Sequence, residues 1–354
     1  MKAAFIACLA IVYVNTSAQR MNKGTSGICG TSFLHELMLN SDPIYADRVN
    51  DFDRLLISNR DNSAVNAVTV VIPVVVHVMH KGEPVGTGTN ISDEAIRDKI
   101  KAINEEFRHI EGTQGDGDGV DCSIEFALAV RGPDNACTSG ITRTDMSSFA
   151  DYMDYGVRLN GTLGMPDATL KALANWDSLQ YYNIYTVSTI DTNIGGYAFM
   201  ASMHGSVLDG TVIRSSSFAD TTSTDEAHEL GHGLNLYHTF EGDGSGATCP
   251  TNTNGCGAGV GDCCGDIPSH KRSDGCFVGT NSCDGNSNTS YLYNYMNYSP
   301  SSCKNMFTAN QKTRMHAAVS TFRNSFLPTN GNNRLVPPDS ELTLVLEMLL
   351  RLPI

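Results

Sequence analysis

The feature that most constrains this 354-residue chain is a histidine-rich segment at residues 225–240, DEAHELGHGLNLYHTF. A helix here would place His228 and His232, four residues apart, on one face, where both imidazoles can reach one zinc ion. Glu229 would then flank the open side of the metal. A catalytic zinc site needs a third protein ligand, and His238 follows six residues after His232. The segment therefore predicts a zinc helix with a further ligand just beyond its end.

The helix must end between His232 and His238, because six more helical residues would turn His238 by about 600°, away from the first two ligands. Asn235 lies midway, and asparagine is the next choice after glycine for the left-handed backbone conformation that a sharp break needs. Another zinc-helix architecture takes its third ligand from a glutamate on a second helix downstream. The three glutamates that follow Glu229 are poorly placed for this role, so His238 is the expected ligand.

The two ends of the chain are interpreted as additions to one catalytic unit. Lys2 precedes the apolar run 3–14, and small residues at 16–18 suit signal peptidase, so residues 1–18 are predicted to be a cleaved secretory signal. A buried N-terminal segment is the alternative. The other predicted divisions are a pro-segment or linker without core elements, a catalytic domain and a C-terminal tail, at residues 19–64, 65–326 and 327–354.

Charge and cysteine content narrow the partners and the compartment. The formal net charge is −14 and no basic cluster is present, which argues against a nucleic-acid partner. No other stretch reaches the roughly 18 apolar residues of a membrane span. Without Cys8, ten of the 11 cysteines remain, and seven of them fall within 249–303. An even number in an exported chain predicts disulfides and a secreted, extracellular protein.

Alternating helix and strand patterns in the first half predict a mixed α/β sheet layer. Strands are expected at 67–80, 124–130, 181–190 and 207–214, and helices at 92–107 and 166–176. Pro73 suggests that the first strand lies at an edge or contains a bulge. Residues 241–300 are rich in Gly, Asn, Ser, Asp and Cys, so disulfides or metal ions are expected to hold this region together.

A second motif, YNYMNYS at residues 293–299, accompanies the histidine segment. Together they resemble the metzincin metallopeptidases and, within them, the pappalysin (cytophagalysin) family. The histidine motif departs from the metzincin pattern only at Asn235, where glycine is usual, and residues 293–299 are similar to the Met-turn of the family. Residues 72–78 and 302–308 also resemble pappalysins. The resemblance covers about 65–325 and implies a metzincin catalytic domain of α/β (α+β) class. In it, a mixed twisted sheet with helices and an irregular, disulfide-rich C-terminal subdomain flank a zinc cleft.

The resemblance also implies roles for single residues. Glu229 would be the general base, Met296 would form a floor beneath the zinc, and Tyr298 would approach the metal or hydrogen-bond the reacting carbonyl. An edge strand that pairs with extended substrate is expected at Gly196, Tyr197 and Ala198. A plain transition from loop to strand is the alternative for these three residues.

The same resemblance implies roles for the cysteines and aspartates. Cys29 lies in a Cys-Gly motif similar to those of the family's pro-segments, so it would bind the zinc in a latent zymogen, unless it is a disulfide partner. The family's spacing implies the disulfides Cys256–Cys283, Cys276–Cys303 and Cys122–Cys137. Structural calcium ions are expected in the irregular half, where a solvated acidic surface is an equally good interpretation of Asp243, Asp262, Asp266, Asp274 and Asp284.

These features favour a secreted zinc endopeptidase that is made as a zymogen and acts on proteins or peptides through a metal-activated water. Its own pro-segment would be an intramolecular inhibitor. An inactive metzincin-fold binding or adhesion module would require loss of the base or of a zinc ligand, and all of these are present. An exopeptidase is the nearer alternative, because it differs only in whether the cleft is closed at one end.

Overall fold

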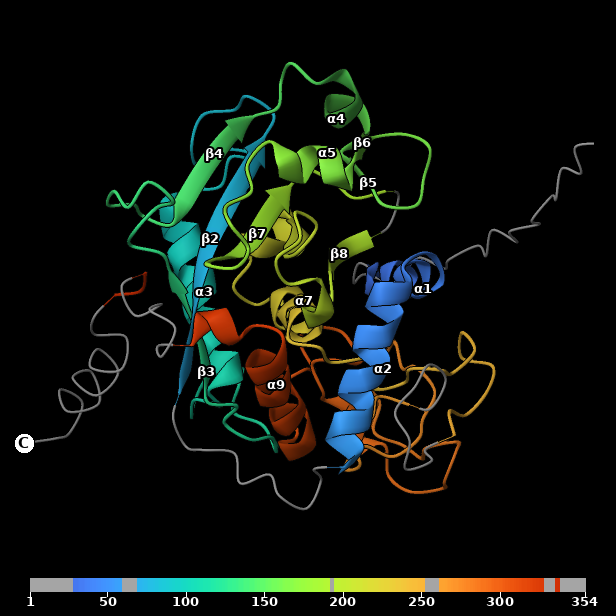
Figure 1. The fold of residues 1–354 in the computed structure, drawn as a ribbon. Helices are drawn as coiled ribbons and strands as arrows, with labels where there is room; N and C mark the ends of the chain where they lie inside the picture. The colour runs from blue at the N-terminus through green and yellow to red at the C-terminus, as the bar shows by residue number, and fades with distance from the viewer. Residues whose placement is uncertain (1–27, 59–68, 192–193, 252–260, 328–334, 338–354) are drawn as a thin grey trace, which may run out of the picture.

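The computed structural model describes residues 28–58, 69–191, 194–251, 261–327 and 335–337 (Figure 1). Its strands are β1 Ile28–Cys29, β2 Val70–His80, β3 Ile124–Leu128, β4 Ile141–Asp145, β5 Val157–Arg158, β6 Met165–Pro166, β7 Tyr182–Val187, β8 Ile194–Ala198 and β9 Thr211–Arg214. Its α-helices are α1 Thr31–Ser41, α2 Pro43–Ser58, α3 Asp93–Phe107, α4 Ala150–Tyr155, α5 Asp167–Ala172, α6 Ser215–Phe218, α7 Asp225–Gly233, α8 Thr289–Leu292 and α9 Ala309–Thr321. Short 3₁₀ helices are η2 Ala201–Met203 and η3 Asn324–Phe326. The predicted signal peptide lies outside the described residues.

A seven-stranded sheet forms the centre of the molecule, in the order β1-β8-β9-β7-β2-β3, with β4 also pairing with β2. Strand β2 pairs in parallel with β7 on one side and with β3 and then β4 on the other. The β8–β9 pair is antiparallel, whereas β1 joins β8 in parallel. The predicted mixed sheet is therefore confirmed, and a separate small sheet pairs β5 with β6.

Pro73 lies inside the central strand β2, so the expectation of an edge or a bulge is wrong. The backbone N–H groups of Val70 and Val76 point toward the β3 and β4 side of the strand. By alternation along a strand, Pro73 faces the β7 side, where pairing begins only at Val74. The missing N–H of Pro73 therefore removes no hydrogen bond from the ladder.

Helix α3 packs on this sheet as its apolar spacing predicts. Its N-cap is Ser92, whose side chain accepts a hydrogen bond from the backbone N–H of Ala95 at 3.1 Å. Ile96, Ile103 and Phe107 have no exposed surface, and each contributes roughly 1.5–3 kcal/mol by burial. The same hydrophobic core includes apolar residues of α7, so this core also fixes α7 against the sheet.

The predicted helix at 166–176 and the strand at 207–214 are both shorter in the structure, as α5 and β9. Helix α5 begins after Pro166, which occupies the N-cap position. Strand β9 begins after Gly210, whose φ of +111° favours glycine and ends the preceding turn.

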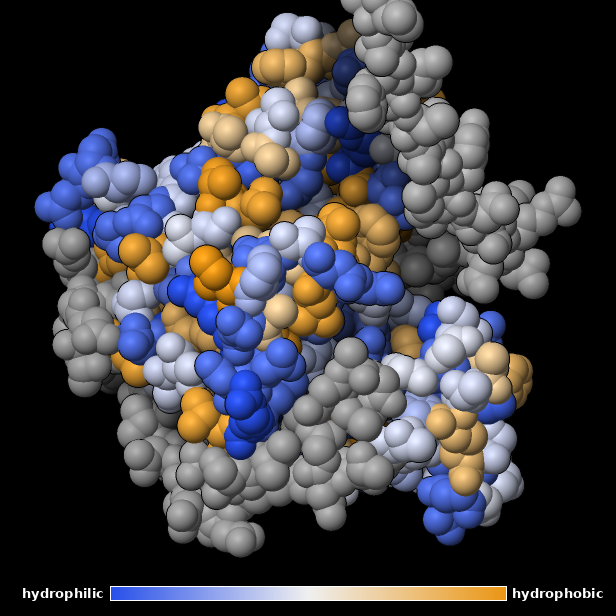
Figure 2. Space-filling view, turned by 45° about the vertical axis from the view of Figure 1, so that its right-hand side comes forward, coloured by the Kyte–Doolittle hydropathy of each residue, from blue (hydrophilic) through white to orange (hydrophobic). Residues whose placement is uncertain are grey.

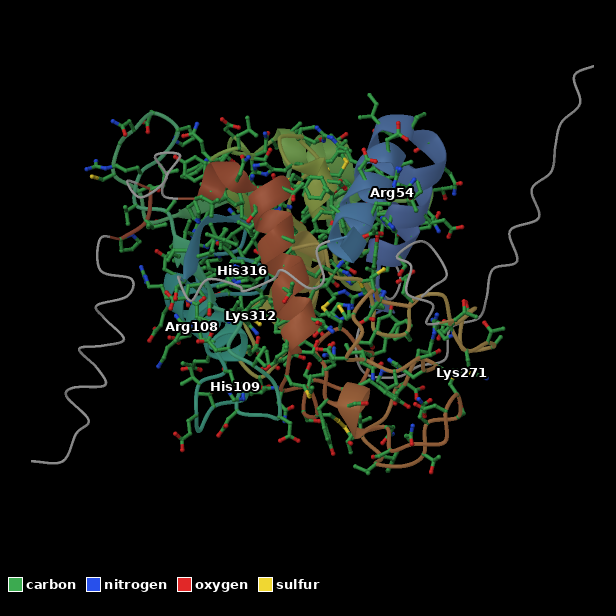
Figure 3. All side chains as sticks on the ribbon, turned by 60° about the horizontal axis from the view of Figure 1, so that its bottom comes forward. Arg54, Arg108, His109, Lys271, Lys312 and His316 are labelled. Atoms are coloured by element: carbon green, nitrogen blue, oxygen red, sulfur yellow. A yellow bond between two sulfur atoms is a disulfide. The ribbon has the colours of Figure 1, made fainter. Side chains whose placement is uncertain are left out.

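Residues 28–58 form ordered elements that pack on the rest of the chain, so the expectation that this segment adds no core element is wrong. Helix α1 contacts β8, and α2 contacts η2 and α9. Figure 3 shows α2, which carries Arg54, beside α9, which carries Lys312 and His316. Phe52 of α2 is only 1% exposed and packs with Ala201 and Ala318.

The region between α7 and α9 is irregular, as its composition predicts, and α8 is its one α-helix within the described residues. A capping box at Thr308 and Gln311 begins α9. The described helices are all too short or too polar to cross a lipid bilayer. Figure 2 shows hydrophilic and apolar residues interspersed over the face in view.

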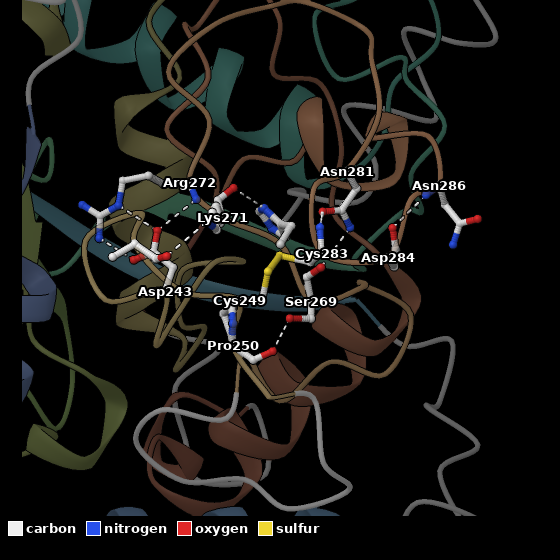
Figure 4. The surroundings of a disulfide bond; sticks show 12 residues. Asp243, Cys249, Pro250, Ser269, Lys271, Arg272, Asn281, Cys283, Asp284 and Asn286 are labelled. Atoms are coloured by element: carbon white, nitrogen blue, oxygen red, sulfur yellow. Dashed lines mark hydrogen bonds and ion pairs between the residues drawn. A yellow bond between two sulfur atoms is a disulfide. The ribbon is translucent and has the colours of Figure 1, made fainter.

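Two disulfides lie in this irregular region. Cys276–Cys303 is the pair that the resemblance implies, whereas Cys283 pairs with Cys249 (Figure 4). The expected Cys256–Cys283 bond is therefore wrong, and Cys256 itself lies outside the described residues.

The expected Cys122–Cys137 bond is also wrong, because β3 separates the two residues. Cys122 is buried before the start of β3, and Cys137 is exposed beyond its end. The five residues of β3 span about 16 Å at a rise of about 3.3 Å per residue. That separation exceeds the roughly 4.4–6.8 Å between the Cα atoms of a disulfide.

Candidate active site

Helix α7 ends where the histidine spacing requires it to end. It spans Asp225–Gly233, and Asn235 then adopts a φ of +72°, the left-handed conformation predicted for the break. The N–H of Leu236 bonds back to the carbonyl of Gly231 at 2.9 Å, which turns the chain sharply. This turn brings His238 back to the two histidines of the helix.

The three histidines direct one ring nitrogen each to a common point. The Nε2 atoms of His228, His232 and His238 lie 3.1–3.2 Å from one another. The Nδ1 atoms of His228 and His232 face the backbone carbonyls of Tyr295 and Leu236 at 2.7 and 2.8 Å. Each Nδ1 therefore donates its proton, and the Nε2 lone pairs converge.

This donor set fits a zinc ion. Three imidazoles at about 2.0–2.1 Å in tetrahedral geometry have nitrogens about 3.3 Å apart, close to the observed spacing. Burial lowers the pKa of His228, His232 and His238, to about 3 for His238, so the rings are neutral, as metal ligands must be. The carbonyls behind the rings fix their tautomers and orientation.

Glu229 lies beside this cluster, 2% exposed. Burial raises its pKa to about 8. Strand β8 approaches it so closely that a Cβ on Gly196 would lie 2.9 Å from the Cγ of Glu229. Glycine at this position therefore leaves room for the carboxylate between α7 and β8.

Met296 and Tyr298 both lie at the cluster. Met296 has no exposed surface, and its sulfur contacts the helix at Gly231, between the first two histidines. The ring centroid of Tyr298 is 4.9 Å from that of His238 and 6.0 Å from that of His228. The floor position implied for Met296 and the place of Tyr298 near the metal site both agree with this geometry.

Cys29 comes from the N-terminal segment to the same point. Its Sγ and one ring nitrogen from each histidine all lie within 4.8 Å of one another, the one such metal-ready cluster among the described residues. The thiol donates to Oε2 of Glu229 at 3.4 Å, and the Thr31 hydroxyl lies 3.2 Å from the same oxygen. The Ser32 hydroxyl lies 2.9 Å from Nδ1 of His238. The N-terminal segment therefore covers both Glu229 and the histidines.

Strand β8 lies between β1 and β9 in the sheet, so it would be an edge strand only without β1. Two of its three predicted residues contact the N-terminal segment. The carbonyl of Gly196 accepts from the N–H of Gly30 at 2.9 Å, and the N–H and carbonyl of Ala198 both bond the Thr31 hydroxyl. All three residues pair with β9, at Ile213, Val212 and Thr211, and the side chain of Tyr197 is buried. On the side away from β9, the backbone groups of Gly196 and Ala198 contact the N-terminal segment, and binding of an extended peptide by these three residues stays a prediction.

The aspartates proposed for calcium have other partners in part. Asp243 binds Arg272, and Asp266 accepts bonds from Thr308 and from the N–H of Asn310 at the start of α9. Asp262 is buried with one oxygen lacking a partner among the described residues. This arrangement does not bring three acidic ligands together within the described chain.

Comparison with known proteins decides the family. The model of peptidase family M43, described as pregnancy-associated plasma protein-A, matches residues 166–320. A promirolysin mutant of Tannerella forsythia has a similar structure, with a TM-score of 0.66 and 26% identity over 88% of this chain and 99% of that chain. Residues 166–320 therefore carry the domain of the pappalysin (M43) family of metallopeptidases.

Other relatives of this pappalysin agree. An extracellular metalloprotease of Verticillium alfalfae is 26% identical over 91% of this chain and 99% of its own length. One of Colletotrichum graminicola is 29% identical over 73% of this chain and 79% of its own. Mature mirolysin of Tannerella forsythia in complex with a cleaved peptide has a TM-score of 0.59 and 28% identity over 76% of this chain and 99% of its own. The predicted fold, metalloprotease activity and extracellular location are thereby confirmed.

Sequence reasoning missed three side chains at this pappalysin site. Thr31 and Ser32 follow the Cys29-Gly30 motif directly, and their place next to Cys29 is the feature of the sequence that could have indicated their contact with the site. Arg272 lies 5.9 Å from the ring of Tyr298, yet nothing in the irregular sequence around it indicates that contact.

Proposed function

We propose that this pappalysin is an endopeptidase, made as a zymogen, in which His228, His232 and His238 hold one zinc ion and Glu229 is the general base. The convergence of three neutral imidazole nitrogens beside a buried carboxylate carries the proposal. Zinc on such a site supplies a Lewis acid that lowers the pKa of water and polarises a peptide carbonyl.

The residues of the chain would share the remaining work. The backbone groups of Gly196 and Ala198 would bind an extended peptide in place of Gly30 and Thr31. Glu229 would accept a proton from the attacking water and pass it to the leaving amine. Tyr298 would donate a hydrogen bond to the carbonyl oxygen as it gains negative charge, an effect often worth about 3 kcal/mol.

We propose that residues 19–64 form an inhibitory pro-segment, ahead of a catalytic domain at 65–326. Cys29 would hold the fourth position on the zinc as a thiolate. The Thr31 hydroxyl would donate a hydrogen bond to Glu229 and so keep water from this carboxylate. The match to promirolysin covers 88% of this chain, and the match to mature mirolysin covers 76%. The difference between the two matches is close to the length of the proposed pro-segment. Cleavage near residues 58–66, which lie largely outside the described residues, would release this segment and open the site.

Structural calcium stays a proposal of the resemblance alone. Among the acidic residues of the irregular half, the buried Asp262 and its unpartnered oxygen give it the most support. Calorimetric titration of the zinc-loaded protein with calcium would test it, because a solvated acidic surface would give no saturable binding.

Incubation of the purified, activated protein with a diverse peptide pool tests the function. We expect cuts at internal bonds, which a zinc chelator abolishes and added zinc restores. Release of single residues or dipeptides from chain ends alone would indicate an exopeptidase. No cutting with zinc bound would indicate a binding module.

A further inference from the structure

Arg272 belongs to the irregular half of the chain, and a buried carboxylate holds its guanidinium in place. Its Nε donates to Oδ2 of Asp243 at 2.9 Å and its Nη2 donates to Oδ1 at 2.7 Å, as Figure 4 shows. The backbone N–H of Arg272 also donates to Oδ2 at 2.9 Å. The Asp243 side chain is 2% exposed and that of Arg272 is 38% exposed. Such a two-pronged contact fixes the plane of the guanidinium.

The fixed guanidinium lies over two aromatic rings at the zinc site. Its central carbon is 5.0 Å from the ring centroid of Phe240 and 5.9 Å from that of Tyr298. These two rings are 4.7 Å apart, and each centroid lies 4.9 Å from that of His238. Within the described part of the chain no hydrogen bond fixes the Tyr298 hydroxyl, so the packing of the ring sets its direction.

We infer that Arg272 is a positioning residue that acts through Tyr298, holding the tyrosine ring against His238 with its hydroxyl at the reacting carbonyl. The inference deepens the proposed proteolysis and rests on it. A cation over an aromatic ring attracts the ring electrostatically, and this attraction restricts the rotation of the ring.

The carboxylate of Asp243 explains why this position needs arginine. Lysine carries the same charge but cannot make the parallel pair of hydrogen bonds, so its ammonium would not stay over the rings. We therefore expect Arg272→Lys to recover only part of the function that Arg272→Met loses.

The test uses the full chain, activated in every case by the same trace of trypsin, for which Arg60 offers a site near the expected cleavage. The variants are Arg272→Met, Arg272→Lys, Tyr298→Phe and the Arg272→Met/Tyr298→Phe double variant. Arg143→Met is the matched control, because Arg143 of β4 forms its ion pair with Asp93 of α3 and not with an aromatic ring of the site. For each, kcat, KM, zinc content and the thermal midpoint are measured with one quenched peptide that the parent cuts.

We expect Arg272→Met to lower kcat per bound zinc by about tenfold, with KM within about twofold of the parent. The kcat of Arg272→Lys should lie between that of the parent and that of Arg272→Met. In the Tyr298→Phe background, Arg272→Met should lower kcat by less than about twofold, because the hydroxyl through which Arg272 acts is already absent. Arg143→Met should leave kcat unchanged.

Three results would overturn the inference: a parent-like kcat for Arg272→Met, a parent-like kcat for Tyr298→Phe, or an equal loss in both tyrosine backgrounds. A fall in thermal midpoint or zinc content at unchanged kcat per zinc would show that Arg272 only joins two loops, which also overturns it. If the parent itself cuts no peptide, the proposed function fails instead, and the two failures are thereby distinguished.

Discussion

Asp53→Ala should loosen the N-terminal segment far more than its position on a surface helix suggests. Asp53 of α2 is 2% exposed, and its two oxygens accept from Arg314 at 2.8 Å and from the Tyr237 hydroxyl at 3.1 Å. Arg314 also donates to the carbonyl of Asn235 at 2.6 Å. One carboxylate of the proposed pro-segment is thus linked to the turn that places His238.

The size of the effect follows from burial. Removing one partner of a buried ion pair leaves the other charge unpaired and costs about 3–5 kcal/mol. Asp51 on the same helix supplies a matched control, because it pairs with Arg54 while both side chains are 67–73% exposed. Such a surface pair contributes at most about 0.5–1 kcal/mol.

Hydrogen exchange of the α2 amides measures the free energy with which this helix stays docked. The variants are made in a Glu229→Ala background, so that the precursor is not cut. Asp53→Ala should speed α2 exchange by about two to three orders of magnitude, and Asp51→Ala by less than about tenfold. Equal acceleration by the two variants would refute the reasoning.

Cys29→Ala should give a precursor that is active early and processes itself faster, which a gel time course checks; unchanged latency would mean that another residue blocks the metal. Burial would raise the pKa of Asp209, but the charge of Arg323 and its hydrogen bonds lower it to about 2. Its contribution of about 2.5 kcal/mol is therefore full above about pH 4 and lost as the pH falls toward 2, so the acid unfolding of Asp209→Asn should be less steep over that interval. Non-reduced peptide mapping should link Cys283 to Cys249, and any other partner would contradict the structure.

The zinc site could be predicted from the sequence because its geometry is local. A spacing of four on a helix and a required break before His238 depend only on helix geometry, and Asn235 has the positive φ that this break needs. The apolar spacing from Ile96 to Phe107 likewise predicted a helix packed on a sheet, because one face of a helix buries against one surface.

Long-range partners could not be predicted in the same way. Pro73 suggests an edge or a bulge because the sequence does not show where the pairing of β2 with β7 begins. Cys283 pairs with Cys249 because the irregular loops between them bring the two residues together. These loops have no periodic sequence pattern from which their path could be predicted. The buried face of α2 packs against α9, η2 and Tyr237, which come much later in the chain.

Three histidines hold the metal in the proposed site while Glu229 accepts and passes on the proton, and the Glu229→Ala variant separates these two roles. Zinc content and kcat are measured on the activated protein, with Glu241→Ala as the control, since Glu241 is the other glutamate beside His238. We expect Glu229→Ala to keep one zinc per chain while its kcat falls by several orders of magnitude, and we expect a far smaller loss of kcat in Glu241→Ala. A Glu229→Ala enzyme that retains its zinc and cuts peptides within about tenfold of the parent rate would contradict the proposed role of Glu229.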